Sequence, residues 1–174
     1  MGTAPAPALA AERADLLQTL ATHRGFLRHT VRDLTDEQGR QRPTVSVLCL
    51  GGIIKHVADV ESSWARFILE GPEALTPGGQ PDPGAWETRF QMLPDETLAG
   101  ILERYAEIAA RTDHLVATYP DLDESQPLPV APWFEPGARR SARRVLLHIV
   151  AETAQHAGHA DILREAIDGS KTMG

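Results

Sequence analysis

Near the end of the chain, four side chains that can bind a metal or carry a proton recur at helical intervals. They are His148, Glu152, His156 and His159, and steps of four, four and three residues place them on one face of a helix. A soluble helix normally fills its inward stripe with Leu, Ile and Val. Because buried imidazoles and carboxylates without partners are costly, such a row faces solvent, forms a satisfied hydrogen-bond network or binds a cation.

These three interpretations of the row can be weighed by its pattern. A solvated face would mix in Lys and Arg, whereas the four positions stay in phase over about three turns. A structural hydrogen-bond network is the second interpretation. A metal site is the third, and it would need a further ligand from another part of the chain.

Four stretches of the chain have the apolar spacing of an amphipathic helix. The second can begin with a cap at Thr44 or Ser46 and stop at Gly71-Pro72, and Gly169 is a natural C-terminal cap for the last. The expected helices cover residues 10–34, 44–70, 95–118 and 139–167.

One short and two long connections join these helices, and no strand pattern competes with them. The first long connection, 71–94, holds a short helix opened by Asp82-Pro83, and Trp86 and Phe90 are expected to pack there rather than bind a ligand. The second covers 120–138. With no internal repeat, the pattern predicts an all-α four-helix bundle with two long loops.

Length and composition predict one folded unit. The chain has 174 residues, 42% of them hydrophobic, which suits one domain with a substantial core. We expect a flexible Pro/Ala tail over 1–8, a single bundle domain over 9–169 and a short tail over 170–174.

Charge and targeting signals narrow the partners. A net charge of −7 disfavours nucleic acid and anionic membranes, and no apolar run is long enough for a transmembrane helix. The N-terminus has no signal-peptide pattern. A single cysteine, Cys49, points to a reducing compartment, so a cytoplasmic protein is expected.

His56 is the strongest candidate for a third ligand. It lies at the edge of the apolar face of the second expected helix, one turn after a Gly51-Gly52 pair. Each helical glycine costs about 1 kcal/mol, so the pair suggests close approach by a packed helix or a ligand. His56, Glu152 and His156 would form a three-ligand site with an open position, as in catalytic metal sites. Zinc is the first expectation, with nickel or iron(II) as alternatives.

Other polar residues have less certain roles. His159 is expected at the rim of the ligands, with a fourth ligand or a proton carrier as the alternative. His148 is expected either to orient Glu152 from outside the ligands or to be a core histidine, and Asp59 to be solvated. His23 falls in the apolar stripe of the first helix, so it is expected to point inward. Cys49 is expected to be a buried small hydrophobe. The arginine cluster, Arg139, Arg140, Arg143 and Arg144, is either a solvated, partly Glu-paired helix start or a patch for an anionic group of a small ligand.

The motif residues resemble a known family. The segments Gly-Gly-Ile-Ile-Lys-His56-Val and His148-Ile-Val-Ala-Glu152-Thr-Ala-Gln-His156-Ala-Gly-His159 are similar to the DinB-like four-helix-bundle superfamily of metalloenzymes. The resemblance runs from the first helix to Gly169 and is strongest to a branch of unknown function related to mycothiol-dependent maleylpyruvate isomerases. It implies the ligands His56, Glu152 and His156, with Glu152 replacing a histidine, and a homodimer.

The expected function follows from the open site and this resemblance. We expect metal-dependent activation of a low-molecular-weight thiol such as mycothiol, in a transferase or isomerase reaction on a small-molecule electrophile. A hydrolase that uses metal-bound water is one alternative. A non-catalytic metal-binding or structural module is another. In a third, the row binds no metal and is a buried polar network.

Overall fold

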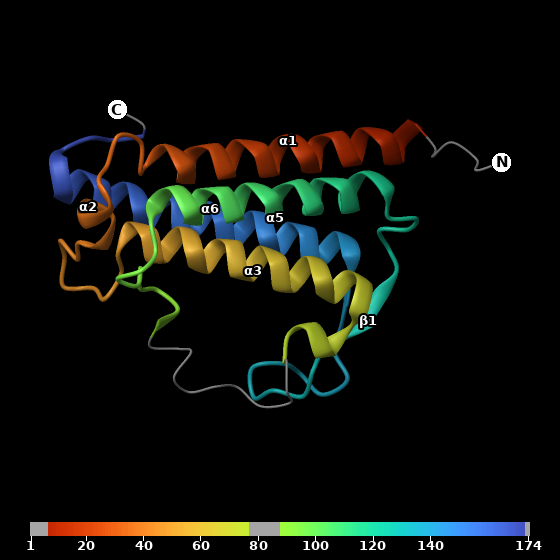
Figure 1. Cartoon of the computed structure of the whole chain (residues 1–174). Coiled ribbons are helices and arrows are strands. Elements are labelled where there is room, and N and C mark those ends of the chain that lie inside the picture. Colours follow the sequence, from red (N-terminus) through yellow and green to blue (C-terminus); the bar gives the residue numbers. More distant parts are fainter. Residues whose placement is uncertain (1–6, 77–87, 173–174) are drawn as a thin grey trace.

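Four long helices build the molecule. The computed structural model describes residues 7–76 and 88–172. Figure 1 shows α1, α3, α5 and α6 lying side by side, which confirms the all-α four-helix bundle. The elements are α1 (Pro7–His29), α2 (Asp36–Arg40), α3 (Leu50–Glu70), η1 (Pro72–Ala74), α5 (Leu98–Thr118), β1 (Ser125–Pro127), β2 (Arg139–Ser141) and α6 (Ala142–Asp168).

Local capping signals set most helix ends. The Thr97 side chain accepts a hydrogen bond from the Gly100 amide at the start of α5, and Ser141 does the same for Arg144 in α6. Gly169 ends α6 in the left-handed conformation, with φ 79°, as predicted. Such caps satisfy backbone groups that have no partner within the helix.

The predicted start of the second long helix was wrong. It begins at Leu50, not at Thr44 or Ser46. The Ser46 amide instead donates to the Thr44 hydroxyl and the Leu48 amide to the Ser46 hydroxyl, at 3.2 and 3.3 Å. Local bonds of this kind compete with helix formation, which explains why residues 44–49 stay outside α3.

Other boundaries also differ from the prediction, and α5 begins at Leu98 rather than at Asp95. The first helix ends at His29 rather than Leu34, and the unpredicted α2 follows, with a capping box between Thr35 and Gln38. Residues 139–141 form strand β2, antiparallel to β1, instead of the first turn of α6. Strands of three residues are too short to show an alternating pattern in the sequence. The short helix expected at Asp82-Pro83 lies outside the described residues.

The apolar stripes of the helices form the core. On α1, Leu16, Leu20 and Leu27 are buried as expected, and Val31 is buried just after the helix ends at His29. The inward position assigned to His23 was wrong, because His23 is half-buried against Phe26 and Arg24 is buried instead. Among the described residues, no helix is both long and apolar enough to cross a membrane.

A buried ion pair explains the position of Arg24. Its guanidinium Nε donates to Glu61 of α3 at 3.1 Å, and Nη1 donates to Asp113 of α5 at 2.7 Å. The side chains of Arg24 and Glu61 are 6% and 0% exposed. Three helices therefore meet at one charged cluster, in which each charge depends on its partner for solvation.

Replacing only one partner of this pair should be strongly destabilising. Glu61→Leu leaves the Arg24 charge buried without its main partner, and we expect a loss of about 3–5 kcal/mol in the free energy of unfolding. The measurement is urea denaturation followed by circular dichroism. The double variant Arg24→Met with Glu61→Leu should recover most of the loss. A double variant as unstable as the single one would show that shape, not charge, is what the site requires.

Candidate metal site

The three ligands expected from the sequence lie together between α3 and α6. His56, Glu152 and His156 each offer one ligand atom, and these atoms lie within 4.8 Å of one another. The imidazole rings of His56 and His156 are 4.9 Å apart, and Nε2 of His156 lies 3.6 Å from a Glu152 oxygen. Both histidines are buried and Glu152 is half-buried.

Apolar residues of α6 turn these ligands toward α3. Ile149, Ala157 and Ala160 are buried, and they share the helix face that carries Glu152 and His156 because steps of three and four residues stay in phase. Their burial fixes the rotation of α6 about its own axis. The ligand positions thus follow from the packing of ordinary core residues.

The electrostatics suit a cation. Burial, then the neighbouring His156 and Arg89, lowers the pKa of His56 to about 4. Burial and then His159 lower the pKa of His156. Both imidazoles are therefore neutral near pH 7 and keep lone pairs for a metal.

The donor set also fits a divalent ion. Among the described residues, the buried Nδ1 of His56 has no hydrogen-bond partner, and an unsatisfied buried polar atom costs about 1–3 kcal/mol. Two imidazoles and a carboxylate are typical ligands of zinc, nickel and iron(II). Ligands of one such ion lie at most about 4 Å apart, so small side-chain rotations would complete the site.

His148 and His159 lie next to the three residues. Nε2 of His148 is 3.8 Å from a Glu152 oxygen, and its ring packs at 4.8 Å on the Trp64 ring. Nδ1 of His159 is 3.4 Å from Nδ1 of His156. Both lie beside the cluster rather than within the group of three, and their expected outer roles stay a prediction.

A segment that precedes α5 forms one wall of the site. We call residues 88–97 the strap. A Cβ atom on Gly52 would lie 1.9 Å from the Phe90 carbonyl oxygen, and one on Gly51 would lie 2.5 Å from the Met92 sulfur. Close approach at the two glycines was expected, but the approaching group is neither a helix nor a ligand. It is the strap, whose backbone at Phe90 leaves no room for a side chain on Gly52, while its Met92 side chain packs against Gly51.

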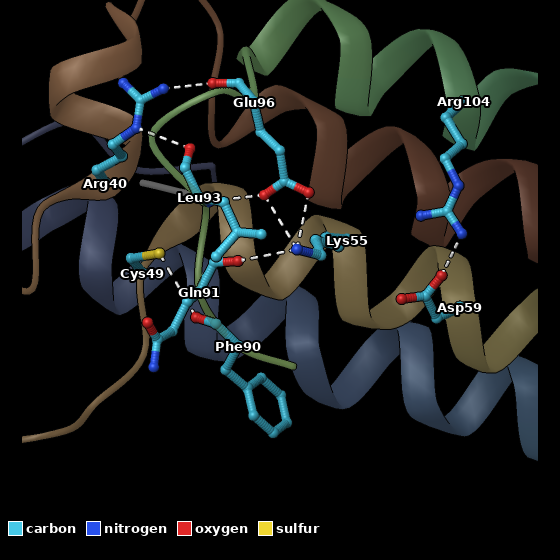
Figure 2. Close-up of polar contacts among 9 residues, drawn as sticks. All are labelled: Arg40, Cys49, Lys55, Asp59, Phe90, Gln91, Leu93, Glu96 and Arg104. Atoms are coloured by element: carbon cyan, nitrogen blue, oxygen red, sulfur yellow. Dashed lines mark hydrogen bonds and ion pairs between the residues drawn. The ribbon is translucent and has the colours of Figure 1, made fainter. Parts of the chain in front are cut away.

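Polar side chains tie the strap to the bundle (Figure 2). Lys55 of α3 donates to the Gln91 carbonyl at 3.3 Å and pairs with Glu96 at 2.7 Å. Arg40 of α2 donates to the Leu93 carbonyl at 3.3 Å. The buried Cys49 thiol lies 3.5 Å from the Phe90 carbonyl oxygen. The strap is thus held at several points along its length.

Phe90 brings the strap into the site. Its ring lies 4.2 Å from the His56 ring and 5.8 Å from the His156 ring, centre to centre. The sequence marked Phe90 only as a packing residue of a long loop. The glycine pair one turn before His56 was the signal that some segment would pack here, although it could not say which. Trp86 lies outside the described residues.

A cleft of about 370 Å³ opens beside His56. Its walls come from α3, the turn after it and the strap, and they combine charged, hydroxyl and aromatic side chains. The lining residues are Lys55, His56, Asp59, Val60, Ser63, Trp64, Leu75, Thr88 and Arg89. The Asp59 side chain is 42% exposed, as expected for a solvated residue, and it also pairs with Arg104 of α5 (Figure 2). A cleft of this size admits a small molecule beside the cluster.

The arginine cluster divides into separate roles. Arg143 pairs with Glu12 and Asp123, and Arg139 donates to the Ser125 hydroxyl at 3.1 Å. Arg143 fits the interpretation of a partly Glu-paired helix start, whereas Arg139 lies in β2 and bonds a hydroxyl. Arg140 is different, because its guanidinium lies over the Trp64 ring at 4.7 Å.

Comparisons with known proteins show the family and the fold. A family model described as mycothiol-S-transferase matches residues 15–169. A search of curated proteins finds none that matches the chain. Among solved structures, the chain is similar to the crystal structure of a conserved protein from Enterococcus faecalis, with 13% sequence identity and a TM-score of 0.64 over 89% of this chain and 96% of that one. At this identity the likeness concerns the fold alone.

Gly52→Ala should displace the strap without touching a candidate ligand. The added methyl group overlaps the Phe90 carbonyl, so we expect a loss of about 1–3 kcal/mol in unfolding free energy and faster hydrogen exchange at the amides of residues 90–93. Gly25→Ala is the matched control, since nothing lies within 4 Å of its Cβ and alanine favours a helix. Equal stability and unchanged exchange in Gly52→Ala would contradict the close contact.

Proposed function

Because this chain belongs to the mycothiol-S-transferase family, within the DinB-like superfamily that its motifs indicated, we propose that it is a metal-dependent S-transferase. In this proposal His56, Glu152 and His156 hold one divalent ion, and the second reactant beside the thiol is a small electrophile. The thiol has a low molecular weight, and the family match makes mycothiol the first candidate.

The observation that carries the proposal is the meeting of the three ligand atoms, within 4.8 Å, beside a cleft. A structural zinc site usually has four protein ligands, whereas a catalytic site has three and leaves a position for water or substrate. In the described residues, the cluster contains two imidazoles and one carboxylate. That count supports a site that accepts a ligand from solution.

The surrounding residues have separate tasks in this function. The two buried histidines stay neutral at pH 7 and contribute nitrogen lone pairs, while Glu152 contributes negative charge. His148, packed on Trp64, orients Glu152 from one side. Phe90 covers the two imidazoles and excludes water. The small molecule would then enter through the cleft beside His56.

A bound divalent ion supplies Lewis acidity, which lowers the pKa of a thiol that coordinates it. The ligand set favours zinc, with nickel and iron(II) as alternatives. The single cysteine, buried in the structure, and the family match support a cytoplasmic location, where low-molecular-weight thiols are reduced.

The test combines metal content with thiol consumption. Protein purified without added metal or chelator should contain close to one divalent ion per chain by elemental analysis, and His56→Ala, Glu152→Ala and His156→Ala should each lose it. With mycothiol and a halo-arene or maleate electrophile, the parent should consume thiol faster than the metal-free protein. The control is His114→Ala, an exposed histidine on α5, which should keep both metal and activity.

Other outcomes would select the alternatives. Metal bound without thiol consumption, but with metal-dependent cleavage of an ester, would indicate a hydrolase. Metal bound, with a large loss of melting temperature on chelation and no turnover, would indicate a structural module. A parent that takes up no zinc, nickel or iron(II) would overturn the proposal and leave the cluster as a buried polar network.

We also propose a homodimer, which the outer face of α6 supports. Leu147 and Ile162 are 50% and 62% exposed, and Leu147 and Val150 border an apolar groove between α1 and α6. Light scattering after size exclusion should give twice the chain mass, and Leu147→Arg should give a monomer. Val130→Arg, on an exposed loop residue, should stay dimeric. A monomeric parent at high micromolar concentration would contradict the proposal.

A further inference from the structure

Phe90 covers the candidate metal site without belonging to the core of the bundle. Its ring centre lies 4.2 Å from that of His56 and 5.8 Å from that of His156. In the described part of the chain, the packed core includes Met92 of the strap but not Phe90, which is half-buried. A half-buried ring outside the core changes rotamer at a lower cost than a core ring does.

The backbone that carries this ring is fixed. The Phe90 carbonyl oxygen packs directly on Gly52 and lies 3.5 Å from the Cys49 sulfur. The next carbonyl, that of Gln91, accepts a hydrogen bond from Lys55 at 3.3 Å. Figure 2 shows the Phe90 ring pointing away from these anchoring contacts. Because the backbone is held and the ring is not packed in the core, movement here falls on the side-chain torsions of Phe90.

The cleft and the cluster meet at one residue. His56 lines the cleft, and so do Thr88 and Arg89, which precede Phe90 in the strap. Among the described residues, His56 is the one member of the cluster that does so, since Glu152 and His156 are not part of the lining. A position that touches all three candidate ligands therefore lies outside the cleft, where the Phe90 ring packs on both imidazoles.

We propose that Phe90 is a gate between the cleft and the cluster, and that it makes the cluster select a thiol over water. The inference rests on the proposed function and names the residue that decides which molecule reaches the open position. To reach the imidazoles, water must replace aromatic contacts that it cannot reproduce. A thiol that displaces the ring keeps contact with it, because sulfur packs favourably at the edge of an aromatic ring.

The first measurement uses the full chain with its metal removed, so the result depends on neither metal nor turnover. Diethyl pyrocarbonate modifies accessible imidazoles, and mass spectrometry gives the rate at each histidine. Phe90→Ala should speed the modification of His56 and His156 by about tenfold or more, because their cover is gone. Phe90→Leu keeps an apolar cover and should stay within about threefold of the parent. The exposed His114 serves as the internal reference.

Phe26→Ala is the matched control. Phe26 also packs on a histidine, because its ring centre lies 6.0 Å from that of His23, but it belongs to α1 and not to the strap. The variant loses the same ring and should leave the modification rate of His56 unchanged. Melting temperatures will show that each variant is folded. Equal modification of His56 in Phe90→Ala and in the parent would overturn the inference.

The second measurement tests selectivity in the metal-loaded protein with mycothiol and a halo-arene. Attack by the thiol forms a carbon–sulfur bond, breaks the carbon–halogen bond and releases a halide ion, while the thiol proton passes to solvent. Attack by water forms a carbon–oxygen bond instead and gives a phenol, a halide ion and a proton. Phe90→Ala should lower the ratio of thioether to phenol by about tenfold, whereas a less stable protein with an intact gate would lose both products together.

The outcomes separate this inference from the proposed function. With metal bound and the parent active, an unchanged product ratio in Phe90→Ala would overturn the gate. A parent that binds no metal, or that forms no thioether, would overturn the proposed function and the thiol selection that rests on it. In that case the modification rates of His56 and His156 still decide whether Phe90 controls access to the cluster.

Discussion

The structure depends on one constraint, which is that α3 buries polar side chains in two directions. Glu61 lies fully buried against Arg24 of α1, and His56 lies buried against His156 of α6. Leaving either group without its partner would cost free energy. The rotation of α3 about its axis is therefore coupled to the rotations of α1 and α6. Apolar packing alone would tolerate several rotations, whereas these polar pairs permit one. The candidate site is therefore part of the same packing that specifies the bundle.

The Gly51-Gly52 pair adds the strap to this arrangement. The two glycines weaken α3 as a helix, but they let the strap backbone lie directly on it and bring Phe90 over His56. Lys55 then neutralises Glu96 and holds the Gln91 carbonyl (Figure 2). One turn of helix thus carries a candidate ligand and the contact surface for the segment that shields it. A cost in local helix stability is offset by tertiary contacts at the site.

Charged side chains line the cleft beside His56. Lys55, Asp59 and Arg89 border it, and Lys55 and Asp59 pair with Glu96 and Arg104. His56 is the residue that the cleft shares with the cluster of two neutral imidazoles and Glu152, a set that suits a cation. Trp64 also lines the cleft and packs on His148. A small molecule in the cleft would therefore meet the cluster through His56.

The sequence by itself determined the helical class, the C-terminal ends of three of the four long helices and the three residues of the candidate site, because helical periodicity and local caps depend on near neighbours in the chain. It placed Glu152 and His156 on one face and marked His56 as their partner. Only the tertiary structure decided that Arg24, not His23, is buried, that the glycine pair receives Phe90, and that Arg140 stacks on Trp64. Those contacts join residues that are 37 to 76 positions apart in the sequence. No local pattern encodes them, because each depends on which surfaces the folded bundle brings together.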